Sequence, residues 1–309
     1  MKGSGANIVG VLLMLWGASD SAQAQEIVRA DSFFKDVSDK VVIQTSPSQK
    51  LVFDESVAKE LILNGHGLVI YADLVEVLGT VRIKAFSDGD VPADSPAVGT
   101  PGNRGGDSGL CGRNGCPGGT GTNGSAGSIG AAGQTAGDIL LGIKNVIGTG
   151  TLIFVDIGQA GGRGGAGGRG GDGGRGGGGA GRACGNIVGQ GKHRPGDGGM
   201  GGTGGNGGLG GQGGPGGPGG VITYADSLGK SIKEGKVQFD FSQARGGVGG
   251  TGGPGGGRGN GGGFGHGAMC GGGGTTGAPG IAGQQGATGP EGEKGRPGKV
   301  VCFGTNCGT

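Results

Sequence analysis

The sequence contains little proline, few aromatic residues and almost no net charge. Only 12 of its 309 residues are proline, aromatic residues make up 4%, and Trp16 is the single tryptophan. Collagen pairs one-third glycine with at least about 15–20% proline or hydroxyproline, so the chain is not collagen throughout. The formal net charge of +2 predicts no general attraction to nucleic acid or to membranes.

Glycine, in contrast, supplies 93 residues. An average soluble domain has about 7% glycine, so an ordinary globular enzyme across the whole chain is excluded. The sequence also lacks G-x-S-x-G, H-E-x-x-H and Walker A motifs. We therefore predict no enzymatic activity, no cofactor and no metal. Asp73 and Asp226, which end two Tyr-Ala-Asp triplets, are expected to be turn residues rather than acid or base groups.

Residues 1–24 have the features of a secretory signal peptide. Lys2 is followed by an apolar run over residues 8–16 and by Ala22-Gln23-Ala24, which predicts cleavage before Gln25. The apolar run is too short to cross a bilayer. We expect an exported protein of the periplasm, cell surface or extracellular space, with no transmembrane segment in the mature chain.

The even number of cysteines in an exported chain indicates disulfides. The six residues are Cys111, Cys116, Cys184, Cys270, Cys302 and Cys307. Free buried thiols are the alternative. A zinc site is less favoured, because no Cys-x-x-Cys occurs and the three histidines are scattered.

Short runs rich in β-branched residues predict strands. They lie at 40–44, 50–54, 60–63, 68–73, 81–86, 138–143, 151–157, 221–226, 236–241 and 299–303. The run LVIYAD at 68–73 nearly repeats as VITYAD at 221–226, and similar β units begin near residues 67, 137 and 220. Such repeats predict stacked rungs. We expect a base at 25–87, further rungs at 138–157 and 221–243, and a strand with a cysteine pair at 299–309.

Between the rungs, glycine occupies every third position. The tracts are 106–133, 158–179, 198–219, 246–255 and 274–298. A three-residue period fits polyproline II, which has three residues per turn. The predicted fold class is mostly β plus polyproline II, with a small β-solenoid or sheet base and a bundle of glycine-rich polyproline II hairpins over 88–298.

Two other interpretations of the tracts stay open. Glycine-rich composition also suits flexible linkers. The Gly-x-y segment 274–298 resembles bacterial secreted collagen-like proteins, which implies a trimer with other copies. The hairpin interpretation resembles in composition the polyproline II bundles of snow-flea antifreeze protein and phage tail-fibre adhesins.

The cysteine positions favour the hairpins. Cys111, Cys184 and Cys270 lie 25, 27 and 29 residues after the rung ends at 86, 157 and 241. Excursions of nearly equal length would bring them, with Cys116, to one distal tip. The sequence then predicts the pairs Cys111–Cys116, Cys184–Cys270 and Cys302–Cys307.

The distal loops are the candidate binding sites, since function often resides on loops held by a rigid scaffold. The candidate residues are Arg113, Lys192, His193, Arg194 and His266. Arg163, Arg169 and Arg175 resemble an RGG segment that binds RNA, but we favour a solvated face and expect no nucleic acid partner. We expect a structural or adhesive surface or matrix protein, with surface or matrix polymers or other copies as partners. The alternative is a glycan- or ice-type ligand binder that uses one face of the bundle.

Overall fold

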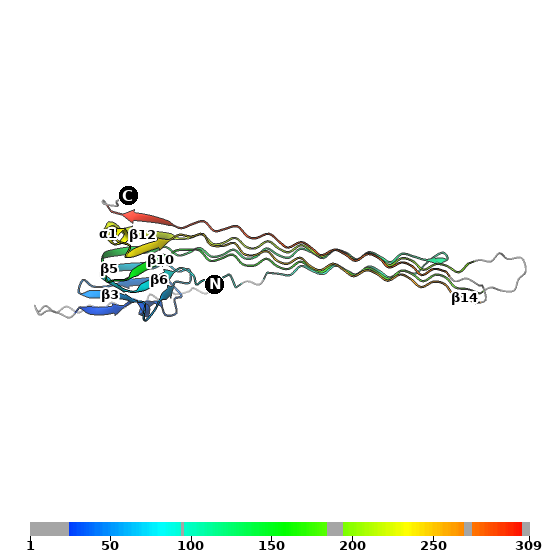
Figure 1. Ribbon diagram of the computed structural model, residues 1–309, viewed down its shortest axis with the longest axis horizontal. Helices are drawn as coiled ribbons and strands as arrows, with labels where there is room; N and C mark the ends of the chain where they lie inside the picture. The colour runs from blue at the N-terminus through cyan, green and yellow to red at the C-terminus, as the bar shows by residue number, and fades with distance from the viewer. Residues whose placement is uncertain (1–24, 94–95, 184–193, 269–273, 305–309) are drawn as a thin grey trace, which may run out of the picture.

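The structure is a computed structural model that describes residues 25–93, 96–183, 194–268 and 274–304. A compact base of β-strands carries a long stalk of extended chain segments that ends in a tip (Figure 1). The predicted signal peptide, Cys184, Lys192, His193, Cys270 and Cys307 lie outside the described residues.

The base contains two parallel sheets. The first has seven strands, in the order β1 (Glu26–Arg29), β3 (Gln49–Asp54), β5 (Leu68–Leu78), β9 (Ile139–Ile147), β12 (Val221–Ala225) and β15 (Lys299–Phe303), and β2 (Val41–Gln44) pairs with β5. The second has the order β13 (Val237–Asp240), β10 (Thr151–Val155), β6 (Thr80–Lys84) and β4 (Glu60–Ile62). From β3 onward, successive strands of the base alternate between the two sheets, as in a solenoid.

Apolar side chains between the sheets form the core. Alternating residues of β5 and β9 point inward, so that Leu68, Ile70, Ile139 and Leu141 are buried. Phe154 of β10 is also fully buried. A 3-10 helix, η1 (Ala30–Phe34), packs on the N-terminal side of the core, and η2 (Asp226–Leu228) and α1 (Gly229–Lys233) connect β12 to β13.

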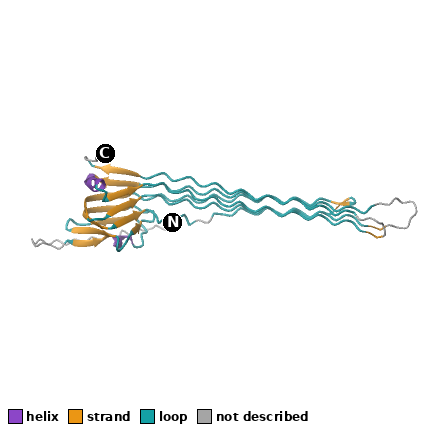
Figure 2. Cartoon of the chain, in the orientation of Figure 1, coloured by secondary structure: helices purple, strands orange, loops and turns teal. Residues whose placement is uncertain are grey.

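The stalk consists of six extended legs without regular secondary structure (Figure 2). We number them leg 1 (96–109), leg 2 (116–136), leg 3 (158–180), leg 4 (196–219), leg 5 (243–266) and leg 6 (274–298). Legs 1, 3 and 5 leave the second sheet, and legs 2, 4 and 6 return to the first. At the tip lie the pairs β7 (Leu110–Cys111) with β8 (Asn114–Gly115) and β11 (Arg182–Ala183) with β14 (Gly267–Ala268).

Backbone hydrogen bonds join the legs at every third residue. One column crosses the entire stalk, with each N–H donating to the preceding carbonyl at 2.7–2.9 Å: Asn103, Thr122, Gly171, Gly205, Gly256 and Gly283. Parallel neighbours are joined as well, for example Gly170 N–H to Pro254 C=O at 2.9 Å. The legs therefore form one continuous two-layer array.

Close approach of backbones explains the glycine pattern. A Cβ on Gly170 would collide with the Gly205 carbonyl, and one on Gly171 with the Asn103 carbonyl. Leg 3 is an inner leg and needs glycine at both positions. In leg 6, at the edge, a Cβ on Gly283 would collide with the Gly205 carbonyl, but the next two residues, Gln284 and Gln285, are exposed. Leg 6 therefore needs only one glycine in three.

The predicted fold class is wrong. The regular secondary structure of the described residues is β-strand, with one short α-helix and two 3-10 helices, and the glycine tracts form no helices. The fold is parallel β-sheet, which agrees with the sheet or solenoid base only in part. A three-residue glycine period shows where backbones approach each other, but it does not by itself specify polyproline II.

Segment 274–298 is leg 6. Its glycine N–H groups donate to leg 5, as from Gly280 to Gly259 and from Gly289 to Gly250, each at 2.9 Å. The groups that would join a collagen triple helix are thus used within one chain.

Candidate functional site

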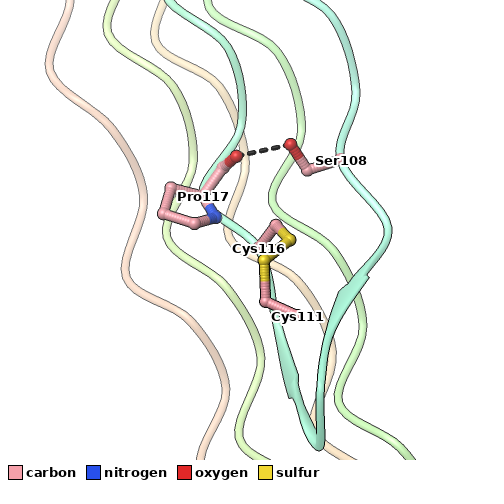
Figure 3. Close-up of a disulfide and its surroundings, with 4 residues drawn as sticks. All are labelled: Ser108, Cys111, Cys116 and Pro117. Carbon is pink, nitrogen blue, oxygen red and sulfur yellow. Dashed lines mark hydrogen bonds between the residues drawn. A yellow bond between two sulfur atoms is a disulfide. The ribbon is translucent and has the colours of Figure 1, made fainter.

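A disulfide-closed hairpin forms one part of the tip. Cys111 and Cys116 are bonded, with their Cα atoms 5.0 Å apart, and Gly112 has a left-handed φ of 67° in the turn. The Ser108 hydroxyl donates to the Pro117 carbonyl and joins the two arms just behind the disulfide (Figure 3). The hairpin therefore has a fixed shape and presents Arg113, which is exposed.

Backbone bonds bring the described candidate residues to one level of the stalk. Ala180 N–H donates to Arg113 C=O at 2.9 Å, and Gly196 N–H donates to Ala180 C=O at 3.1 Å. Gly265 N–H, next to His266, completes this link with a bond to Gly196 C=O at 2.9 Å. Arg113, Arg194 and His266 thus lie at the tip ends of neighbouring legs, and all three are exposed.

Two of these residues have neighbours that orient them. Arg194 lies 3.7 Å from the Asp197 carboxylate, which also accepts the Thr275 N–H at 2.6 Å and the Thr275 hydroxyl at 2.9 Å. The Thr275 N–H is the main reason that the pKa of Asp197 is lowered. The His266 ring packs against Phe264, with the ring centroids 4.8 Å apart. The tip therefore combines cationic and aromatic groups suited to binding a polar or anionic polymer.

The two broad faces of the stalk differ in charge. Legs 1, 3 and 5 form a charged face, on which Arg104 pairs with Asp107 at 2.7 Å and Arg169 with Asp172 at 2.8 Å. Asp107 accepts the Arg175 N–H and Asp172 accepts the Gly257 N–H, and these bonds are the largest causes of the lowered pKa of each carboxyl. Of the arginines of leg 3, Arg169 is therefore compensated by an ion pair with Asp172.

Legs 2, 4 and 6 form an uncharged face over the middle of the stalk. Its exposed residues are polar, amide-bearing or aliphatic, and include Thr120, Asn123, Ala126, Ile129, Met200, Thr203, Asn206, Leu209, Gln212, Ala278, Ile281, Gln284 and Ala287. Asn206 N–H donates to Asn123 Oδ1 at 2.8 Å, and Gln284 N–H donates to Asn206 Oδ1 at 2.9 Å. Ile129, Met200, Leu209 and Ile281 are 57–73% exposed.

A buried carboxylate lies where stalk and base meet. Asp156 is 0% exposed, and neither of its oxygens has a hydrogen bond of normal geometry. Burial raises its pKa to about 6, the Gly220 N–H opposes that rise, and the charge of Asp138 adds to it. Asp156 is not among the residues nominated from the sequence, where its only signal is an acidic residue near the end of the apolar run 151–157.

The described residues contain no group of three or more His, Cys, Asp and Glu side chains that could hold a metal ion. No helix within the described ranges is long and apolar enough to cross a membrane. Cys302 is disulfide-bonded, and its predicted partner lies outside the described residues. The predicted Cys184–Cys270 bridge lies outside them entirely, although the adjoining strands β11 and β14 pair with each other.

Comparison with known proteins identifies no family. No protein-family model matches the chain, and no curated protein matches it. Among solved structures, it resembles the nine polyproline type II helical bundle springtail antifreeze protein from Granisotoma rainieri, whose crystal waters match the ice lattice. The identity is 24%, the match covers 59% of this chain and 94% of that chain, and the TM-score is 0.11. A likeness at that TM-score establishes no shared fold, and none of these findings supports the resemblance to bacterial collagen-like proteins.

Proposed function

We propose that the protein is an exported, non-enzymatic scaffold of the cell surface or extracellular matrix, which holds a binding tip away from a folded β base. The observation that carries this proposal is the hydrogen-bond column from Asn103 to Gly283, which repeats along the stalk. Each leg is bonded to its neighbours at every triplet, so the stalk resists bending as a unit. An extended chain spans at most about 3.3–3.6 Å per residue, so leg 3 separates tip and base by up to about 80 Å.

The tip is the adhesive part in this proposal. Arg113, Arg194 and His266 are exposed at the tip ends of neighbouring legs, and the disulfide hairpin limits the entropy lost on binding. Guanidinium groups bind carboxylate, sulfate and phosphate groups through paired hydrogen bonds. The proposed partners are therefore anionic surface or matrix polymers.

The test compares adhesion of protein-coated beads to cells and to immobilised anionic and neutral polysaccharides. The tip variant replaces Arg113, Arg194 and His266 by alanine, and the matched control carries Arg163→Ala on the charged face. We expect the tip variant to lose adhesion and the control to keep it. Equal adhesion of the tip variant and the unmodified protein would exclude the tip as the binding site.

A second candidate function is favoured by the uncharged face. Its aliphatic and amide groups repeat every three residues on a hydrogen-bonded backbone, which suits a neutral, regularly repeating ligand such as a glycan or ice. Leu209→Lys would place a charge in the middle of this face, and Val248→Lys makes the same change on the charged face. Loss of polysaccharide binding or of thermal hysteresis in Leu209→Lys alone supports this candidate, and absence of both activities in the unmodified protein excludes it.

A further inference from the structure

The N-terminal and C-terminal sides of the base differ in how the ends of the two sheets are covered. On the N-terminal side, η1 covers the core with buried Ala30, and Phe34 and Val37 pack against it. On the C-terminal side the sheets end at β15 and β13, and within the described residues no strand lies beyond either of them. Figure 1 shows β15 along this outer edge of the base. Within the described residues, both sheets end in a strand with one unpaired edge on each side, β1 and β4 on the N-terminal side and β15 and β13 on the C-terminal side. The sides differ because η1 covers the core next to β1 and β4, whereas β15 exposes apolar side chains at the opposite edge, on what we call the open side.

The open side is apolar. Val300, Val301 and Phe303 of β15 are 45%, 44% and 76% exposed. Between the two open edges lies a partly buried aromatic group in which Phe239 is 5.9 Å from Tyr224 and 6.1 Å from Phe241, measured between ring centroids. An exposed apolar edge strand is a ready template for pairing with another chain.

The two open strands run in opposite directions. β13 leads into leg 5 and so runs toward the stalk, whereas β15 follows leg 6 and runs away from it. A copy rotated by 180° about an axis along the stalk would bring its β13 antiparallel to β15 and its β15 antiparallel to β13. A single extended peptide could satisfy only one of these edges, but a second copy satisfies both at once, as an isologous interface requires.

We propose that a second copy of this chain binds this open side, so that the two sheets continue across a two-fold dimer and the two stalks point the same way. The proposal goes beyond the adhesive function and does not depend on it. The edge of the stalk on the same side is open as well: in leg 5 the N–H groups of Gly249, Gly252 and Gly255 have no partner among the described residues. The dimer would present two tips together, which raises avidity without a new contact.

Sedimentation of the oxidised full chain over a range of concentrations tests the interface. Val301→Lys adds a charge to β15, and Ile27→Lys is the matched control, since Ile27 is a 60% exposed residue of β1 at the opposite edge. We expect a dimer for the unmodified protein and for Ile27→Lys, and self-association weaker by on the order of 100-fold for Val301→Lys. A monomer or a trimer of the unmodified protein would overturn the proposal, as would loss of the dimer in Ile27→Lys only.

A measurement on the unmodified protein covers the case in which Val301→Lys does not fold. Amide hydrogen exchange of residues 299–303 should slow as the protein concentration rises, whereas exchange of residues 26–29 should not. Self-association that leaves exchange at 299–303 unchanged would place the interface elsewhere and refute the proposal.

Discussion

The Thr122 hydroxyl accepts a hydrogen bond from the backbone N–H of Asn103 at 2.7 Å. Leg 1 is an edge leg, and this N–H has no further leg beyond it to bond to. Ser125 does the same for the Thr100 N–H, also at 2.7 Å. Hydroxyl groups of leg 2 thus accept hydrogen bonds from the outer N–H groups of leg 1, which have no neighbouring leg in the described part of the chain whose carbonyls could accept them.

Replacing Thr122 by valine keeps the shape of the side chain and removes the acceptor. We expect a loss of about 1 kcal/mol, since a typical hydrogen bond contributes about 0.5–1.5 kcal/mol. Amide exchange at Asn103 should accelerate, while exchange in leg 4 stays unchanged. Thr120→Val on the uncharged face is the control, and an equal effect from both variants would contradict the edge role of Thr122.

Gly171→Ala should be strongly destabilising. The new Cβ would collide with the Asn103 carbonyl, and relief requires the legs to separate, at a cost of at least about 1–3 kcal/mol. Gly178→Ala is a matched control in the same leg, because the nearest atom to its Cβ would be the Gly263 carbonyl oxygen at 3.7 Å. Thermal unfolding should separate the two variants, and similar melting temperatures would refute the packing argument.

The buried Asp156 should make stability fall as the pH rises. Its folded pKa of about 6 lies above the ordinary aspartate pKa of 3.8, so the folded protein binds this proton more tightly than the unfolded one. The resulting stability is present below about pH 4, is lost as the pH rises through 6, and amounts to at most about 3 kcal/mol.

Urea unfolding of Asp156→Asn at pH 5 and pH 8 tests this. The variant should be more stable than the unmodified protein at pH 8 and should lose less stability between the two values. If the variant and the unmodified protein lose the same stability between pH 5 and pH 8, Asp156 does not titrate in this range.

Replacing both Cys111 and Cys116 by serine should loosen the tip and leave the base intact. Closing so short a loop contributes about 2 kcal/mol in the chain-entropy model. Amide exchange at Ala180, which donates to Arg113, should accelerate, while the core strand β5 keeps its protection. A global loss of stability equal to the local one would mean that tip and base unfold together.

The strands were the most predictable part of the fold. Alternation of Val237 and Phe239 with polar neighbours indicated a half-buried strand, and β13 occupies that run. Asp73 shows the limit of local patterns: it was expected in a turn but lies inside β5, where Lys144 pairs with it at 2.8 Å. Pairing with β9 continues the strand past the triplet and overrides the local turn preference.

The stalk and its surfaces were less predictable. For segment 274–298 the sequence left an intermolecular collagen helix open as an alternative, because one glycine in three looks the same whether the neighbouring legs belong to the same chain or to other copies. The charged face consists of legs 1, 3 and 5 and the uncharged face of legs 2, 4 and 6. This arrangement follows from hydrogen bonds between residues far apart in the sequence, which local patterns do not show. The tip residues Arg113, Arg194 and His266 could be nominated, because equal excursion lengths imply a common end.

The pairing register of the base has a consequence for how the chain folds. Ile139 of β9 pairs with Ile222 of β12, and the same 83-residue offset joins Asn123 to Asn206 within the stalk. A slip by one residue in the base would bring side chains onto glycine positions along two whole legs. The pairing register must therefore be set in the base, where apolar side chains favour the correct alignment over a shifted one. The hydrogen bonds between the legs would then form in sequence from the base to the tip. Since those pairings join residues far apart in sequence, we expect slow folding that is limited by assembly of the base.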